Sequence, residues 1–356
     1  MLFNHMEAPM SRKLLTLSLT ATLMGGTTFA DAPRVAVDIA PVHSLVARVM
    51  EGVGTPDLIV QAGASPHEYS LRPSEAAALQ NANLVFWIGS GLTPWLTDTI
   101  ETLAPDAAAT ELLEADGTIE LKFREGALFD AHDDHEEDEH GDDDDHKDDD
   151  DDHADEAHED HEEEGHDDHS DDDHNDEEAG HEVHDHGAHD PHAWLSPQNA
   201  ITWMNVIAGQ LSAADPDNAG AYFANAAAGR AEIKVLIGEV RATLDPVRGG
   251  QFVVFHDAYQ YFEMDFDFPA SGAISISDAS DPSPARIAEI QGRIAAQGID
   301  CVLAEPQFNL GLVLTVLDGT EAEMGILDPL GSDLKPGLAL YPQLIRNLST
   351  ALASCM

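Results

Sequence analysis

A run of 60 residues, 131–190, limits what this chain can fold into, because it consists almost wholly of aspartate, glutamate and histidine. It holds 33 acidic side chains, 14 histidines and a single lysine, Lys147. With so few apolar side chains it cannot offset the entropic cost of ordering, so we predict a disordered loop. Imidazole and carboxylate groups both bind divalent metals, and a histidine-rich tract is typical of metal binding.

Two interpretations of this acidic loop remain open. In the first, it is a solvated tract whose affinity for metal is incidental. In the second, its negative field raises the local concentration of cations, and its imidazoles hold metal weakly beside a stronger site to which the loop is tethered. The sequence on both sides of the loop is that of an ordinary globular protein, and we predict a metal-handling protein with this disordered loop set into its first half.

The rest of the chain is acidic as well. The 356 residues carry a formal charge of −52, of which the loop supplies −32 and the remaining residues about −20. A chain of this charge should avoid nucleic acid and anionic membrane surfaces and attract cations. Its length suits two lobes of ordinary size better than one small domain.

Residues 1–30 have the pattern of a cleavable export signal. A basic pair precedes an apolar, leucine-rich stretch, Leu14 to Met24, and small residues then lead to Ala30, a suitable cleavage point. The apolar stretch is too short to remain as a membrane anchor, and no other apolar run in the sequence reaches 18 residues. We therefore expect a periplasmic protein that is not embedded in the membrane, with either Met1 or Met10 as its natural start.

Cys301 and Cys355 are the only cysteines in the chain. In an oxidising compartment such a pair favours a disulfide, and closing a loop of this length would stabilise the fold by about 4 kcal/mol on the chain-entropy model. Two buried thiols are the alternative.

Strand-like and helix-like patterns alternate in both halves of the sequence, which indicates parallel α/β sheets. Between the halves, residues 217–244 form the longest helical pattern, about 40 Å long at 1.5 Å per residue. We therefore predict an α/β fold of two lobes, each a mainly parallel sheet flanked by helices, joined by one long rigid helix. The predicted boundaries are 31–212 for the N-terminal lobe, 215–245 for the linking helix and 250–356 for the C-terminal lobe.

Three histidines outside the loop stand where predicted strands end or helices begin. His67 follows a strand at 58–60, His256 follows a strand at 252–255, and His192 precedes a helix that begins near Pro197. Ligands of open α/β sheets bind at the carboxyl ends of the strands, so we expect these side chains to meet in the cleft between the lobes. Three neutral imidazoles suit tetrahedral Zn²⁺, whereas a carboxylate-rich set would suit Mn²⁺.

Other conspicuous side chains have structural interpretations. His43 is expected to be a polar residue near a helix start, and Trp87 and Trp203 are expected in the core. Trp95 and Trp194 stand near the predicted cleft and are candidates for its wall, although ordinary packing is the preferred interpretation for Trp95.

Five motifs spread over nearly the whole mature chain resemble the landmarks of the zinc-uptake ABC-transporter substrate-binding proteins. They are Ser65 to Ser74 (SPHEYSLRPS), Asp190 to Pro197 (DPHAWLSP), Phe255 to Tyr259 (FHDAY), Ala304 to Phe308 (AEPQF) and Leu327 to Gly331 (LDPLG). The acidic loop before the second motif and the cysteine pair near the end are likewise similar to the zinc-specific branch.

The resemblance implies a two-lobed binding protein that holds Zn²⁺ in its cleft through His67, His192 and His256. Some members of the branch have glutamate directly before the first histidine, but this chain has Pro66 there, so that position cannot supply a ligand. The fourth place then falls to Asp328, to water, or to a histidine of the loop, and Asp328 is preferred over Glu68.

The resemblance also assigns supporting and partner roles. Asp257 and Glu305 would be acids that support the ligands or the fold. The protein would act as a monomer and deliver zinc to an inner-membrane ABC permease and its ATPase subunit, and it would not be an enzyme.

Three alternatives are kept. The same fold could carry Mn²⁺ or Fe²⁺, or the protein could be a periplasmic zinc store or chaperone. A hydrolase with a three-histidine zinc site is the third, since such a site with an open position can activate water.

Overall fold

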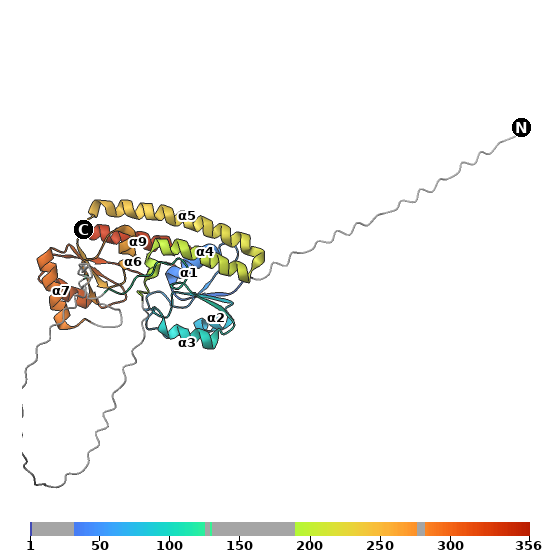
Figure 1. Cartoon of the computed structure of the whole chain (residues 1–356), viewed down its shortest axis with the longest axis horizontal. Helices are drawn as coiled ribbons and strands as arrows, with labels where there is room; N and C mark the ends of the chain where they lie inside the picture. The colour runs from blue at the N-terminus through green and yellow to red at the C-terminus, as the bar shows by residue number, and fades with distance from the viewer. Residues whose placement is uncertain (2–31, 125–128, 130–188, 276–281) are drawn as a thin grey trace, which may run out of the picture.

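In the computed structural model, the residues described are Met1, 32–124, Phe129, 189–275 and 282–356. All but the first residue of the predicted signal, and all but the last two residues of the predicted loop, lie outside these ranges. The described chain forms two α/β lobes with a long helix, α5, running along one side of both (Figure 1).

The N-terminal lobe is built on a parallel sheet of four strands in the order β2-β1-β3-β4. β1 and β3 are buried on both faces and consist of apolar residues, as central parallel strands require. The three helices of this lobe have proline as their first or second residue, which suits the first turn of a helix because its missing N–H is not needed there. The elements are β1 (Val35–Val37), α1 (Ala40–Val49), β2 (Asp57–Leu58), α2 (Pro73–Asn81), β3 (Leu84–Trp87), α3 (Pro94–Leu103) and β4 (Ala108–Glu111).

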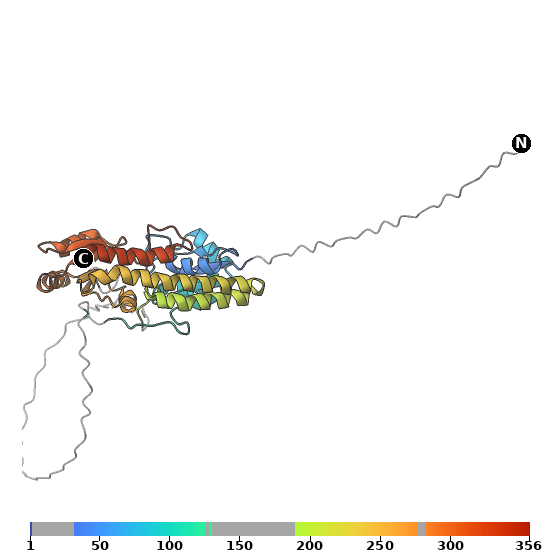
Figure 2. The same ribbon diagram turned by 90° about the horizontal axis from the view of Figure 1, so that it is seen from above.

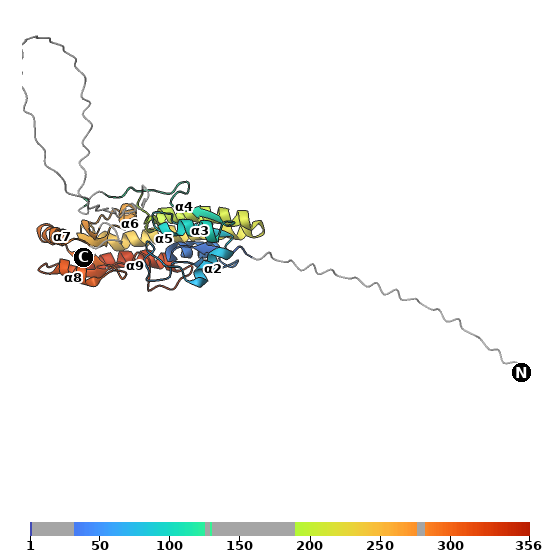
Figure 3. The same ribbon diagram turned by 90° about the horizontal axis from the view of Figure 1, so that it is seen from below.

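The C-terminal lobe repeats this topology, with a parallel sheet in the order β6-β5-β7-β8. In each lobe the first strand therefore has the second strand on one side and the third strand on the other. Open α/β sheets form their binding crevice at this point, where the direction of strand addition changes. The elements are β5 (Phe252–His256), α6 (Gln260–Phe266), β6 (Gly272–Ser275), α7 (Pro284–Gln297), β7 (Cys301–Ala304), α8 (Leu310–Leu317), β8 (Glu323–Ile326) and α9 (Leu340–Cys355). Figure 3 shows α2 and α3 at one end of the molecule and α7 and α8 at the other.

The linking helix α5 (Ala219–Leu244) has 26 residues and packs between α4 (Pro197–Ala214) and α9 (Figure 2). Its buried side chains recur at helical spacing, among them Tyr222, Ala226 and Ile233. At Gly229 an added Cβ would lie 2.5 Å from the sulfur of Met204, so glycine permits the close approach of α4. One continuous apolar core includes residues of both lobes and of α5, so the helix is packed along its length rather than exposed as a tether.

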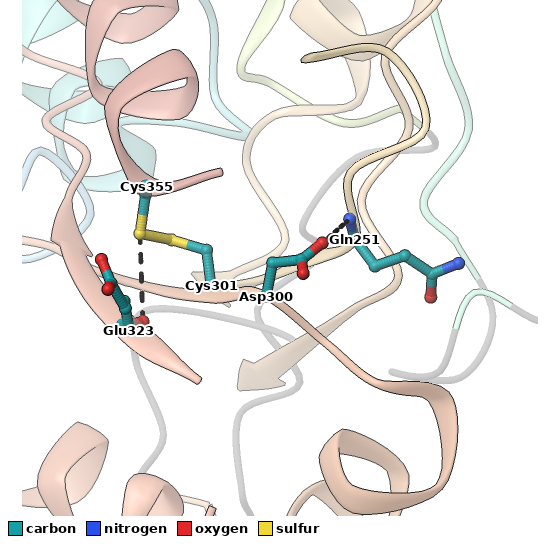
Figure 4. The surroundings of a disulfide bond; sticks show 5 residues. All are labelled: Gln251, Asp300, Cys301, Glu323 and Cys355. Atoms are coloured by element: carbon teal, nitrogen blue, oxygen red, sulfur yellow. Dashed lines mark hydrogen bonds between the residues drawn. A yellow bond between two sulfur atoms is a disulfide. The ribbon is translucent and has the colours of Figure 1, made fainter. Parts of the chain in front are cut away.

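A disulfide joins Cys301, the first residue of β7, to Cys355, the last residue of α9, with the two Cα atoms 5.7 Å apart. Figure 4 shows the bond lying against β8, where the sulfur of Cys355 faces the carbonyl group of Glu323. The predicted pairing is confirmed, and the alternative of two buried thiols is set aside.

The predicted fold class is confirmed, with differences at the level of elements. β4 has no counterpart among the predicted strands, because it is an edge strand whose four side chains are all exposed or only half-buried. The linking helix begins and ends within the predicted 215–245, with a 3₁₀ turn at each end, Pro216–Asn218 and Asp245–Val247. Within the described ranges, none of the helices combines the length and apolarity needed to cross a bilayer.

Candidate metal centre

The three predicted histidines line one cavity between the lobes. His67 comes from the loop after β2, His192 directly precedes a 3₁₀ turn (Ala193–Leu195) that leads into α4, and His256 is the last residue of β5. The cavity has about 20 Å³ of room for the centres of water-sized particles. Its full lining is Ser65, Pro66, His67, His192, Trp194, His256, Glu305, Gln307, Phe308, Pro329 and Leu330.

His192 and His256 present their Nε2 atoms to the same point, 3.4 Å from one another. Both side chains are buried, and their ring centroids lie 5.2 Å apart. With Zn–N bonds of about 2.0–2.1 Å and tetrahedral angles, two ligating nitrogens lie about 3.4 Å apart. The two imidazoles are therefore spaced as a single zinc ion requires.

A carboxylate lies behind each of these two rings. The Nδ1–H of His192 donates to Oδ1 of Asp190 at 2.6 Å, and the Nδ1–H of His256 donates to Oε1 of Glu305 at 2.6 Å. Such bonds fix the tautomer and the orientation of the ring, so the lone pair is left on Nε2, where it can bind a metal. Both carboxylates are 1% exposed, so they also place two negative charges close to the point where a cation would sit.

His67 approaches from the loop after β2, with its ring centroid 5.9 Å from that of His192. Its loop is held by the indole of Trp95, whose Nε1–H donates to the carbonyl oxygen of Pro66 at 2.8 Å. Trp95 also stacks at an angle against Tyr69, whose hydroxyl donates to Glu75. Within the described part of the chain, no group of three or more His, Cys, Asp or Glu side chains is placed so that it could hold a metal ion without some rearrangement.

Asp328 has contacts of a different kind from those expected of a ligand. Its Oδ1 accepts from the backbone N–H groups of Leu330 and Gly331 at 3.0 Å, and its Oδ2 accepts from both the N–H and the hydroxyl of Ser332. The carboxylate thus caps the turn at residues 329–332, and Asp328 does not line the cavity. Glu68 is exposed.

The other predicted residues take structural positions. His43 is buried in α1, where Nε2 donates to the carbonyl oxygen of Pro56 at 3.0 Å and burial lowers the pKa of the ring.

Trp87 and Trp203 are in the core, as expected. Trp194 lines the cavity and donates from Nε1 to the carbonyl oxygen of Pro329 at 2.8 Å, whereas Trp95 acts on the cavity only through its bond to Pro66.

Asp257 forms an ion pair with Arg124, which also bonds Glu263 of α6. Burial raises the pKa of both carboxyl groups, and the guanidinium opposes that shift. Asp257 is therefore a structural acid, while Glu305 is the acid that orients a histidine.

Sequence reasoning did not single out Asp190, Gln307 or the bond from Trp95 to Pro66. Asp190 could have been found, because it stands two residues before His192 and a carboxylate at that distance can reach the same ring. Gln307 and Trp95 gave no comparable signal, since their roles depend on contacts between segments far apart in the sequence.

Comparison with known proteins places this site in a family. The model of the ZnuA family, described as zinc-uptake complex component A, periplasmic, matches residues 35–355. The chain is 46% identical over 343 residues to the high-affinity zinc uptake system protein ZnuA of Brucella abortus, which covers 96% of this chain and 97% of that protein. It is 45% identical over 328 residues to the protein of the same name from Paracoccus denitrificans, with coverage of 92% and 93%.

Solved structures agree on the fold. A crystal structure of ZnuA matches with a TM-score of 0.66 at 21% identity, over 91% of this chain and 99% of that one. A ZnuA deletion mutant with zinc bound matches with a TM-score of 0.65 at 22% identity, over 91% and 98%. A binding protein from Pseudomonas aeruginosa in complex with Mn²⁺ matches equally well, with a TM-score of 0.65 at 17% identity, over 91% and 97%, so the fold alone does not select the metal. The family model and the relatives together show that the chain belongs to the ZnuA family, the periplasmic component of zinc-uptake complexes.

Proposed function

We propose that the chain captures Zn²⁺ between the Nε2 atoms of His67, His192 and His256, with a water molecule in the fourth place. The observation that carries the proposal is the pair of Nε2 atoms 3.4 Å apart, each on a ring whose Nδ1 is bonded to a buried carboxylate. Water is preferred to Asp328 because both oxygens of that carboxylate are already bonded within its own turn.

The charge balance of the site favours the same conclusion. Three neutral imidazoles leave the two charges of Zn²⁺ unneutralised, and Asp190 and Glu305 supply two opposite charges just behind the ligands. A metal that prefers oxygen ligands would bind here less tightly than Zn²⁺, since the proposed ligands are nitrogen atoms.

The test is a competitive metal titration of the mature protein beside three variants, His67→Ala, His192→Ala and His256→Ala. The expected result is tight binding of one Zn²⁺, preferred over Mn²⁺, which each single change weakens by orders of magnitude. His43→Ala is the matched control, because it removes a buried histidine that lies away from the cavity, and its zinc affinity should stay close to that of the unchanged protein. Tight binding that survives all three cavity changes would contradict the assignment.

Delivery is the next part of the proposal. The chain would carry zinc, as a monomer, to an inner-membrane permease that an ATPase subunit drives, after removal of a signal that ends at Ala30. Membership of the zinc-uptake family supports this role. Restoration of growth under zinc limitation, in a strain that lacks its own zinc-binding component, would test it and would separate import from storage.

The acidic loop completes the proposal as an auxiliary, low-affinity collector of zinc. Its C-terminal end supports this role, because His189 forms a β-bridge with Lys122 and Asp190 directly contacts His192. Zinc released at this end of the loop would therefore already be close to the cleft.

A further inference from the structure

His67 stands slightly farther from His192 than a shared zinc ion requires. The centroid of a ligating imidazole lies about 3.2 Å from the metal, so two such rings at the tetrahedral angle have centroids about 5.2 Å apart. The centroids of His192 and His256 are 5.2 Å apart, whereas those of His67 and His192 are 5.9 Å apart. A shift of the His67 ring by less than about 1 Å would therefore bring it to the required distance.

The three histidines also differ in what supports them. His256 is the last residue of the buried strand β5, and His192 leads directly into a 3₁₀ turn and α4. His67 lies in the irregular loop between β2 and α2. A ligand on a loop loses conformational freedom when the metal fixes it, so any contact that already holds the loop raises the affinity for the metal.

The indole of Trp95 holds the peptide group that precedes His67. Its Nε1–H donates to the carbonyl oxygen of Pro66 at 2.8 Å, and Pro66 is buried. A peptide group is planar, so a hydrogen bond that fixes this carbonyl also fixes the backbone nitrogen and Cα of His67. The φ rotation of His67 is then the only backbone rotation left between the held peptide group and the imidazole.

Trp95 is itself held in place. It is the second residue of α3, and its neighbours Thr93 and Leu96 are fully buried. Its ring lies 5.7 Å from that of Tyr69, whose hydroxyl donates to the carboxylate of Glu75 in α2 at 2.9 Å. The loop is therefore held on both sides of the histidine, to α3 at residue 66 and to α2 at residue 69.

We infer that Trp95 is a positioning residue for zinc binding, which holds the loop so that His67 stands within a small movement of the metal. Trp95 does not line the cavity, so it acts only through the loop. The inference rests on the proposed three-histidine site and adds to it a residue that determines how tightly one ligand binds. The coupling is reciprocal: if the bond to Pro66 favours bound zinc, bound zinc favours that bond by the same factor.

The first measurement compares the zinc affinity of Trp95→Phe with that of the unchanged mature chain, by competition against a chromophoric chelator. Phenylalanine keeps an aromatic ring beside Tyr69 but cannot donate to Pro66. The affinity should fall about 3- to 10-fold, the change that one hydrogen bond of ordinary strength represents. Trp203→Phe is the matched control, because it also removes an indole bond, the one to Thr118 at 2.9 Å, and Trp203 does not line the cavity. Equal affinities in the two variants would overturn the inference.

A double-mutant cycle separates positioning of His67 from a general effect on the fold. In the His67→Ala background, Trp95→Phe should change the remaining zinc affinity by less than about twofold, because the residue that it positions is gone. In the His256→Ala background it should keep its full effect. Equal effects in both backgrounds would overturn the inference and leave the three-histidine assignment intact. Zinc binding that survives all three histidine changes would overturn both.

The last measurement needs no substitution, so it holds even if Trp95→Phe does not fold. Hydrogen exchange of the Trp95 indole N–H, followed by nuclear magnetic resonance, reports how often the bond to Pro66 opens. Because the coupling is reciprocal, one equivalent of zinc should slow this exchange by the same factor of about 3 to 10. An exchange rate that zinc leaves unchanged would overturn the inference.

Discussion

At the scale of single residues, the carboxylates behind the histidines decide how the site can bind metal. Asp190 is itself held from two sides, since its Oδ2 accepts from Gln260 at 2.6 Å and its carbonyl oxygen accepts from the hydroxyl of Tyr261 at 2.7 Å. Both of these donors belong to α6, which follows His256 in the chain. The helix that follows the ligand His256 therefore also fixes the acid that orients His192.

We predict that Asp190→Asn lowers zinc affinity about 10- to 100-fold with little change in the fold, because the neutral amide orients His192 less firmly and no longer balances charge. Competition against a chromophoric chelator measures the change. Asp333→Asn, at an exposed position, is the control. Equal affinities in the two variants would show that Asp190 does not support the ligand.

Asp38 makes the stability of the metal-free protein depend on pH. It is fully buried at the end of β1, where its oxygens accept from the N–H groups of Ile39 and Ile88, and burial raises its pKa to about 7. Between the ordinary pKa of 3.8 and about 7, the folded state holds a proton that the unfolded state has released, so this group's contribution to stability falls as pH rises.

We therefore expect the free energy of unfolding of the unchanged protein, relative to that of Asp38→Asn, to fall between pH 5 and pH 7 and to level off above that. The slope should be at most about 1.4 kcal/mol per pH unit, the limit for a single proton. Urea titrations of both metal-free proteins at each pH measure the difference. A difference that stays constant from pH 5 to pH 8 would contradict the assignment.

At the scale of elements, a segment that follows β4 crosses to the C-terminal lobe and is fastened to α6. The N–H of Leu121 donates to Tyr261, the carbonyl oxygen of Lys122 accepts from Gln260, and Arg124 pairs with Asp257 and Glu263. The two carboxylate side chains are only 7% and 6% exposed. The guanidinium is thus the counter-charge that makes their burial tolerable.

Arg124→Met should destabilise the protein by about 3–5 kcal/mol, because it leaves two buried carboxylates without their cation. Arg346→Met is the matched control, since Arg346 and its partner Glu239 are 42% and 48% exposed, and loss of a surface pair costs about 0–1 kcal/mol. Thermal and urea unfolding of the two variants give the comparison. Similar losses in both would mean that Arg124 is not needed as a counter-charge.

At the scale of the whole molecule, two sheets of the same strand order share one continuous core along α5. The sequence allowed this architecture to be predicted because its central strands, such as β3 and β5, are apolar throughout and its helices have clear starts. The edge strand β4 was missed because an exposed strand carries no apolar pattern.

The metal centre, like the fold, could be predicted from the sequence only in part. The positions of His67, His192 and His256 followed from where the strands end, so the three could be expected in one cleft. The contacts of Gln307 and Trp95 depend on turns that bring distant segments together, and a sequence pattern does not contain that information. The hydrogen bonds of Asp328 within its own turn could not be predicted either, and its role as a ligand stays a prediction from the resemblance.

Deleting residues 132–189 should leave the tight binding of one zinc ion intact and remove only the additional, weaker equivalents. The physical reason is that the three cavity histidines and their carboxylates all lie outside the deletion. Isothermal titration of the deletion variant and the full chain gives both stoichiometries. Loss of the tight equivalent would mean that the loop supplies a primary ligand.

Zinc K-edge absorption of the mature chain, loaded with one equivalent of zinc, identifies the atoms bound to the metal. We expect three nitrogen ligands of imidazole type and one oxygen, with Zn–N distances of about 2.0–2.1 Å. Each of the His67→Ala, His192→Ala and His256→Ala variants that still binds zinc should show one imidazole ligand fewer. A set of mainly oxygen ligands, or a spectrum unchanged by all three substitutions, would rule out the three-histidine site.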